Sequence, residues 1–307
     1  MMLGTCSLPH ILMRYFTTPS VKSARKSVAW SLLFIFLLYF TAPALSTLSQ
    51  IQMLVPNLAT GIIGKAFSEV QSLDWIQNWS NVGMLAISDS NGDGILQLNE
   101  FFMRADIVVL ATPEIAGLPY VISGLVAAGG MAAAMSTADG LLLAISNSLS
   151  HDMYYKIIDP SADTRKRLIV ARVLLIAIGA AGAFVASMKL TSILGAVAWA
   201  FDFAMSGLFF PIVLGIWWKR ANRQGAIAGM FFGLVSGTAY LYYVGPKFMA
   251  MEPWLGIDHL RFGIIGASVS LVAMVVVTLM TEEPDEATQK MVDDLRVPAG
   301  DTIIAQK

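Results

Sequence analysis

The longest apolar run of the chain, Leu118–Ser150, constrains every fold that the chain can adopt. An α-helix rises about 1.5 Å per residue, so roughly 20 apolar residues cross the hydrocarbon core of a bilayer. Near the middle of this run stands the polar sequence Ser136-Thr137-Ala138-Asp139-Gly140. Ionisable side chains within a membrane usually face a cavity or a partner and mark the path of an ion or a substrate. The run therefore predicts a transmembrane helix with a role in transport.

The composition excludes several other classes of protein. Hydrophobic residues make up 56% of the chain and charged residues 13%, whereas a soluble domain carries about 25% charged residues. A net charge of −1 provides no basic field for nucleic acid, so we predict no nucleic-acid partner. One cysteine, Cys6, and three scattered histidines exclude an intrachain disulfide and a zinc site of the usual spacing.

Six segments are apolar and long enough to cross a bilayer. They are Val28–Leu48, Leu118–Ser150, Leu168–Met188, Ile193–Trp218, Ala226–Val244 and Phe262–Met280. The first follows Lys22, Arg25 and Lys26 as a signal peptide would. Its apolar stretch is longer than the roughly 7–15 residues of a signal sequence, so we interpret it as a retained helix. The prediction is an all-α integral membrane protein with about six transmembrane helices.

The distribution of Lys and Arg predicts the orientation, because these residues are enriched in cytoplasmic loops. Basic residues gather in residues 1–27 and in the loops after the second and fourth spans: Arg14, Lys22, Arg25, Lys26, Lys156, Arg165, Lys166, Arg167, Lys219, Arg220 and Arg223. We therefore expect a multi-pass protein of the plasma (inner) membrane with both termini in the cytoplasm. Residues 1–27 would form a cytoplasmic loop, residues 28–281 the transmembrane region, and residues 282–307 an acidic, partly helical cytoplasmic tail.

Residues 49–117 are predicted to form a long loop on the outer side, with short helices over Leu54–Val70 and Asp74–Ile87. Within this loop, residues 89–100 fit the twelve-residue calcium loop of EF-hands, including the glycine at its sixth position. The ligands would be Asp89, Asn91, Asp93, the Ile95 carbonyl, Gln97 and Glu100. We predict a weak structural calcium site that holds the outer loop. The alternative is a polar turn that binds nothing, because a single loop lacks the usual paired partner.

The polar centre of the second span offers oxygen atoms to an ion. On a helix, Ser136 and Asp139 share a face, Ala133 lies one turn earlier and Thr137 lies beside that face. The small residues around them leave room for an ion to meet hydroxyl and carbonyl oxygens. In the alternative interpretation, the hydroxyls bond the carbonyls four residues earlier. Asp139 favours a functional role, since a carboxylate in mid-membrane costs at least ~2.5 kcal/mol.

A second acidic residue, Asp202, lies in the fourth predicted span. It is either a second functional group or a partner of a Lys, an Arg or a backbone donor. The residues leave both alternatives open.

Three blocks of sequence carry a resemblance to a known family. They are Gly4–Phe16 with Ala24–Ser27, Ala133–Thr137 with Ser150–Tyr154, and Phe210–Arg220 with Gly225 and Ala226. In these blocks the chain resembles the sodium:solute symporter family, most closely its cation/acetate symporter branch. The blocks run through nearly the whole chain except the outer loop and the tail, and Met135-Ser136-Thr137 is the most specific.

The resemblance implies a fold and a site. The fold would be the second half of a five-plus-five inverted repeat (APC/LeuT-like), with binding sites between broken helices near mid-membrane. The Ala133 carbonyl and the Ser136 and Thr137 hydroxyls would then contribute to a sodium site. A second sodium site of some members matches Ser136, Asp139 and Gly140, where Asp139 replaces a neutral ligand. That site would bind its ion more tightly, take a proton or be absent.

The chains of that family are much longer than this one, which leads us to expect a truncated or split permease. The missing N-terminal half, supplied as a separate chain, would complete the sodium site and the substrate pocket. The leading hypothesis is sodium-coupled symport of a small organic solute, such as the monocarboxylate acetate, by alternating access. The alternatives are a proton-coupled carrier that uses Asp139 and a calcium-responsive membrane receptor or structural subunit. No nucleophile–base pair stands out, so we predict that the protein is not an enzyme.

Overall fold

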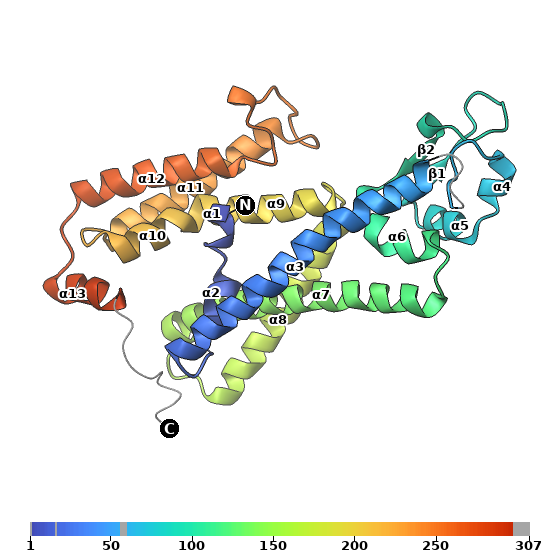
Figure 1. Ribbon diagram of the computed structural model, residues 1–307. Helices are drawn as coiled ribbons and strands as arrows, with labels where there is room; N and C mark the ends of the chain where they lie inside the picture. Colours follow the sequence, from blue (N-terminus) through green and yellow to red (C-terminus); the bar gives the residue numbers. More distant parts are fainter. Residues whose placement is uncertain (1, 16, 56–59, 297–307) are drawn as a thin grey trace. The chain divides into compact units, whose positions relative to one another are not determined.

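A computed structural model describes residues 2–15, 17–55 and 60–296 (Figure 1). Six helices within these residues are long and apolar enough to cross a membrane, and each coincides with a predicted span. They are Val21–Leu54 (α3), Tyr120–Ile158 (α7 and η3), Thr164–Ser187 (α8), Ile193–Trp217 (α9, η4 and α10), Arg223–Val244 (α11) and Gly263–Met280 (α12). The prediction of an all-α integral membrane protein is confirmed. Residues 56–59 of the predicted outer loop and 297–307 of the predicted tail lie outside the described residues.

The chain divides into two compact units, each of which is described by itself. One unit comprises Lys26–Asp139, and the other comprises Met1–Arg25 together with Gly140–Lys307.

In the unit Lys26–Asp139, much of the predicted outer loop folds into a small domain with its own core, which we call the outer domain after that prediction. The domain contains α4 (Phe67–Gln71), α5 (Asp74–Asn81), β1 (Leu85–Ile87), η1 (Leu98–Glu100), β2 (Phe101–Met103), η2 (Ala105–Ile107) and α6 (Val108–Ile115). Its core is formed by buried apolar side chains of Met53, Ile62, Val70, Trp75, Ile76, Leu85, Leu96, Ala111 and Ile115. A loop that buries this much apolar surface has a fixed fold of its own.

The predicted helices of this loop are confirmed only in part, since α5 begins at Asp74 as predicted but both predicted helices are too long. The helix predicted over Leu54–Val70 is absent from residues 60–66, because the Gly64 N–H bonds the Leu96 carbonyl and the chain turns there with φ +85° at Gly64. The helix predicted over Asp74–Ile87 ends at Asn81. Gly83 follows with φ +69°, and β1 then pairs antiparallel with β2, Ala86 opposite Phe102. Long-range strand pairing overrides the local helical pattern in both places.

In the other unit, the first helix is interrupted. Helix α1 (Met2–Thr5) ends in a turn at residues 6–8, and α2 (Pro9–Tyr15) begins beyond it. Proline disfavours helical geometry at the residue before it and suits the first position of a new helix, which explains a break at Leu8–Pro9. Ser7 is fully buried in the break and donates a hydrogen bond to the Leu3 carbonyl at 2.8 Å.

The fourth span is also irregular. Its first part, α9 (Ile193–Ala204), passes into a π-helical turn, η4 (Met205–Phe209), before α10 (Phe210–Trp217) completes it. Ser206 lies in this turn, has no solvent exposure and donates a hydrogen bond to the Asp202 carbonyl at 2.7 Å. The second span likewise ends in a π-helix, η3 (Ser148–Ile158). Such turns inside helices are often found at functional sites.

Helices α11 and α12 lie side by side and make the closest helix pair of this unit (Figure 1). A row of glycines at every fourth position, Gly225, Gly229, Gly233 and Gly237, is buried on α11. We call this row the glycine seam. It contacts Thr278, Met274 and Ser270 of α12 and Ser206 of η4. Small residues in such a row let helices approach closely within a membrane.

The segment Gly245–Phe262 between α11 and α12 includes a short 3-10 turn, η5 (Trp254–Gly256), which packs over one end of the pair. Tyr240 accepts a hydrogen bond from the Trp254 N–H at 2.9 Å and donates one to the Ile257 carbonyl at 2.8 Å. After α12, the helix α13 (Glu286–Leu295) confirms a partly helical tail.

Replacing Gly233 with alanine tests the glycine seam. A Cβ at Gly233 would clash with the Ser206 backbone oxygen and lie 2.7 Å from the Ser270 Cβ. We expect a loss of about 1–3 kcal/mol, the usual cost of overpacking a filled core, measured as a lower midpoint of thermal unfolding in detergent. Gly182→Ala in α8 is the matched control, because nothing lies within 4 Å of its Cβ position. Equal midpoints for the two variants would contradict a tight seam.

Candidate functional site

Three of the four predicted sodium ligands, Ala133, Ser136 and Thr137, lie within little more than one turn of α7, and the fourth, Asp139, follows on the next turn. Thr137 Oγ1 donates a hydrogen bond to the Ala133 carbonyl at 3.2 Å. This contact is the helix-internal bond of the alternative interpretation, and it is present for Thr137. The carbonyl oxygen keeps a second lone pair, and Ser136 adds a hydroxyl one residue away. Three oxygen atoms therefore stand within one turn, which is a suitable wall for a hard monovalent cation.

These residues are not enclosed by their own unit. Ala133, Ser136, Thr137 and Asp139 are all exposed in the structure, and none of the ion pairs found among the described residues involves Asp139. One helical turn supplies too few oxygens to surround a cation. Further ligands have to come from other segments, so the sodium site stays a prediction.

Asp202 has a backbone donor, which was one of the alternatives for this residue. Its side chain comes from α9, is 4% exposed, and accepts a hydrogen bond from the Gly263 N–H at 3.1 Å. Gly263 is the first residue of α12, and no side chain of its own segment caps that helix. The carboxylate of Asp202 therefore satisfies the N-terminus of α12, where a negative charge is favourable.

The predicted calcium loop, residues 89–100, is held firmly at its middle. Gly94, the sixth position, has φ +73°, which lets the chain reverse there. Leu96 is fully buried in the core of the outer domain, and its N–H donates to the Lys65 carbonyl at 2.9 Å. The Phe67 N–H donates to the Gly94 carbonyl at 2.8 Å, so the loop forms a short bridge with the segment before α4.

The carboxylates of this loop converge on backbone N–H groups. Glu100 is 3% exposed, and its two oxygens accept hydrogen bonds from the N–H groups of Ser90 at 2.8 Å and Gln97 at 3.1 Å. Asp89 accepts from the Gly92 and Gly94 N–H groups at 2.8 and 3.1 Å.

Asp93 completes the set of loop carboxylates. It accepts hydrogen bonds from the Ile95 N–H at 2.8 Å and from Gln97 Nε2 at 2.7 Å, and the bond from Ile95 is the main cause that lowers the pKa of its carboxyl. A lowered pKa keeps Asp93 charged at neutral pH, which is the state that a cation requires.

The loop differs from an EF-hand in its flanks, which are β1 and η1–β2 rather than two helices. Within the described ranges, no group of three or more His, Cys, Asp or Glu side chains is gathered closely enough to hold a metal ion. The hydrogen bonds to the loop carboxylates stabilise the turn without an ion. Calcium binding by Asp89, Asn91, Asp93, Ile95, Gln97 and Glu100 stays a prediction.

Two features of the unit that contains α1 and α11 were missed by the sequence analysis. The break between α1 and α2 is marked in the sequence by Leu8–Pro9, and the glycine seam is marked by four glycines at intervals of four residues. Both signals are local and could have been found. The π-helical turn at Met205–Phe209 has no comparable sequence signal.

Comparison with known proteins gives consistent results. Residues 106–233 match the family described as the sodium:solute symporter family. An uncharacterised symporter of Cupriavidus necator is 41% identical over 303 residues, which cover 96% of this chain and 43% of that protein. A monocarboxylic acid transporter of Corynebacterium glutamicum is 25% identical over 78% of this chain and 36% of its own length. A sodium/proline symporter of Haemophilus influenzae is 30% identical over 54% of this chain and 31% of its own length.

Replacing Glu100 with alanine should loosen the loop of the outer domain. Hydrogen bonds to a charged group are worth about 1.5–3 kcal/mol each, and the substitution removes the buried carboxylate that accepts such bonds from the N–H groups of Ser90 and Gln97. We expect their amide hydrogens to exchange roughly fivefold to hundredfold faster by mass spectrometry. Glu69→Ala is the control, because that side chain is 59% exposed and pairs only with Lys65. Unchanged exchange in the Glu100 variant would show that the carboxylate does not hold the loop.

Proposed function

Because the chain belongs to the sodium:solute symporter family, we propose that it forms part of a transporter that couples the movement of a small organic solute to that of sodium ions. Transport would proceed by alternating access, driven by the inward sodium gradient. The observation that carries the proposal is the cluster of oxygen atoms on one turn of α7, inside the segment that matches the family.

The chain spans less than half the length of the curated relatives it matches. We propose that it corresponds to their C-terminal portion and to the second half of a five-plus-five inverted repeat. The interrupted helix α1–α2 supports this proposal, since broken helices form the binding sites of such transporters. In this arrangement α1–α2 would be only the end of the first helix of the repeat. The other four helices of the repeat would be α3, α7, α8 and α9–α10, and α11 and α12 would follow. The other half would come from a companion segment or chain.

The proposed sodium site uses the Ala133 carbonyl and the Ser136 and Thr137 hydroxyls as one wall. The companion half would supply the opposite wall. Asp139, one turn further along α7, would bind a second ion or take a proton. A carboxylate exposed on a transmembrane helix is costly unless it serves such a role.

A monocarboxylate such as acetate is the proposed solute. One relative is named a monocarboxylic acid transporter and another a sodium/proline symporter. A monocarboxylic acid and proline each carry one carboxylate group. We therefore propose that the solute site recognises a carboxylate.

The proposed orientation places both termini in the cytoplasm of a cell whose plasma membrane holds the protein. The Lys and Arg residues of the connecting segments support it, because positive charge favours the cytoplasmic side. The outer domain with its calcium-type loop would then face the exterior.

Uptake assays in proteoliposomes test the sodium site. The chain is joined to the N-terminal half of the Cupriavidus necator symporter, and acetate uptake is measured at fixed pH with and without sodium. We expect Ser136→Ala with Thr137→Ala to weaken the apparent sodium affinity by about tenfold or more, since two ligands to a charged ion are removed. Ser123→Ala, on the same helix and 13 residues from Ser136, is the matched control.

Three results of this assay decide between the hypotheses. Unchanged sodium dependence in the double variant would contradict the assignment of the site. A proton-coupled carrier would be favoured if uptake is independent of sodium, is driven by a proton gradient and is lost in Asp139→Asn. Transport by the unjoined chain alone would contradict the need for a companion half.

We also propose that residues 89–100 bind one calcium ion weakly and thereby hold the outer domain. Calcium titration of the full chain, followed by isothermal calorimetry, should give a dissociation constant of about 10⁻⁴–10⁻³ M, as in other extracytoplasmic sites. Asp89→Asn with Asp93→Asn should abolish the binding heat, whereas Asp74→Asn outside the loop should not. Equal binding heats for the two variants would contradict the proposed calcium site. A calcium-dependent change in a protein that transports nothing would favour the receptor hypothesis.

A further inference from the structure

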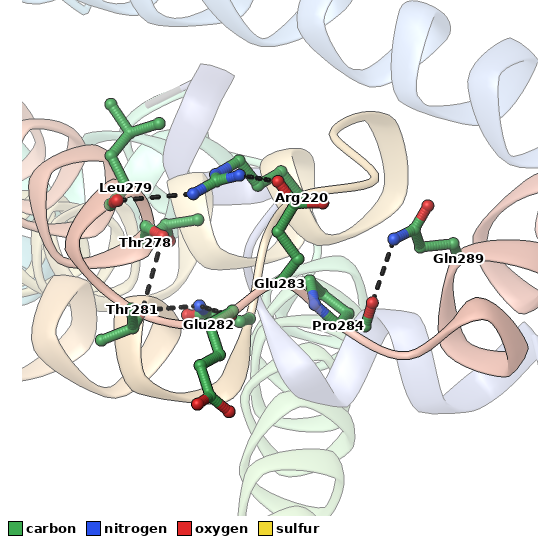
Figure 2. Close-up of polar contacts among 9 residues, drawn as sticks. Arg220, Thr278, Leu279, Thr281, Glu282, Glu283, Pro284 and Gln289 are labelled. Carbon is green, nitrogen blue, oxygen red and sulfur yellow. Dashed lines mark hydrogen bonds and ion pairs between the residues drawn. The ribbon is translucent and has the colours of Figure 1, made fainter.

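After α12 the chain turns back and packs against the connection between α10 and α11 (Figure 2). We call residues Thr281–Arg296 the tail segment and residues Trp218–Asn222 the basic loop. Asn222 Nδ2 donates hydrogen bonds to Thr281 Oγ1 at 2.6 Å and to the Glu282 carbonyl at 2.9 Å. These two bonds fix the start of the tail segment on the basic loop.

Arg220 adds an ion pair at the same place. Its guanidinium pairs with the Glu283 carboxylate, and Nη2 reaches the Leu279 carbonyl at 3.4 Å (Figure 2). The arginine thus bonds both the last turn of α12 and an acidic side chain of the tail segment just beyond it.

The far end of the tail segment contacts α10 itself. Arg296 donates from Nε to the Ile216 carbonyl at 3.0 Å and from Nη2 to the Trp217 carbonyl at 3.1 Å. Its guanidinium also lies 5.4 Å from the centre of the Trp217 ring. The last carbonyls of a helix lack partners within the helix, and a cationic side chain satisfies them favourably. Arg296 is therefore a C-terminal cap of α10 that is supplied by another helix.

A second ion pair joins α13 to the basic loop. Lys219 Nζ lies 2.8 Å from Asp293 Oδ2, and the two side chains are 50% and 49% exposed. On α13, Val292 is the buried residue. Charged pairs with this much exposure shift an equilibrium by only about twofold to fivefold each, and salt screens them. The tail segment is thus attached mainly by polar contacts that can open.

The packing of α10 differs along its length. Residues 210–215 are half-buried, and α10 contacts α11 and α12 as well as η4, whereas its last residues, Ile216 and Trp217, are exposed. Met205, Ser206 and Gly207 of the preceding turn η4 are buried. Gly233 of the glycine seam packs directly on Ser206. One end of α10 is thus joined to a fixed π-helical turn, and the other end is held by the tail segment.

We propose that the tail segment is a releasable strap that fixes the Trp217 end of α10 through Lys219–Asp293, Arg220–Glu283 and the Arg296 cap. Release of the strap removes the contacts that hold the exposed Trp217 end of α10, and ionic strength controls the release. The contacts that form the strap are present whether or not the proposed transport function is correct. In a transporter the strap would set the position of one half of the fourth span.

Hydrogen exchange of the full chain in detergent, read from peptides that cover α13, tests the strap. A free helix of ten residues is marginal in water, so the amides of α13 are protected only while the tail segment is docked. We expect Asp293→Lys to speed their exchange by about fivefold or more, because it replaces an attraction to Lys219 with a repulsion. The added change Lys219→Asp should restore the rate to within about twofold.

Asp294→Lys is the matched control. It makes the same charge change on the next residue of α13, and Asp294 has no ion pair among the described residues. Raising the salt from about 0.05 to about 1 M should speed exchange in the unaltered chain in the same direction as Asp293→Lys.

Any of three results would contradict the strap. The α13 amides could exchange without protection in the unaltered chain, or exchange at the same rate in Asp293→Lys and Asp294→Lys. In the third, adding Lys219→Asp to Asp293→Lys would fail to restore the slower exchange. Peptides from α10 provide the second readout. Release of the strap should also speed exchange at the Trp217 end of α10, and unchanged exchange there would mean that the tail segment docks without holding the helix.

Discussion

The absence of water from the core of a bilayer is the constraint on which the rest of this structure depends. A backbone N–H or carbonyl there needs a partner within the protein, so the spanning segments are helices. Interruptions are tolerated only where another group satisfies the backbone. In the turn η4, Ser206 donates to the Asp202 carbonyl, and the start of α12 receives the carboxylate of Asp202. Each irregularity has a specific partner.

Close packing then decides which parts of the membrane region are fixed. The glycine seam brings α11 against α12 and η4, where the contacts leave no room for a larger side chain at Gly233. By contrast, α10 is half-buried over residues 210–215 and exposed at Ile216 and Trp217, where Arg296 holds its end. The packing is therefore tightest at the glycine seam and loosest at the Trp217 end of α10.

Much of the membrane region could be predicted from the sequence, since all six spans follow from apolar runs of sufficient length. The fold of the outer domain could not be predicted from the sequence. Its helix prediction failed after Asn81 because β1 finds its partner in β2, and at Gly64 because the chain pairs there with Leu96. Of the candidate site, the sequence predicted the residues on one turn of α7. Helical spacing shows which residues share a face, but it does not show which other segment faces them.

The sequence by itself determined that this chain is a multi-pass membrane protein, which of the described helices are long and apolar enough to span a bilayer, and to which family the chain belongs. These properties depend on local composition and on residue patterns that can be read in order along the chain. Only the tertiary structure decided that the calcium-type loop joins two strands, that Asp202 accepts a hydrogen bond from the start of α12, and that the tail segment packs against the end of α10. Each of these depends on a contact between distant residues, such as Arg220 with Glu283, 63 positions apart. Such contacts arise from the path of the folded chain and leave no local pattern in the sequence.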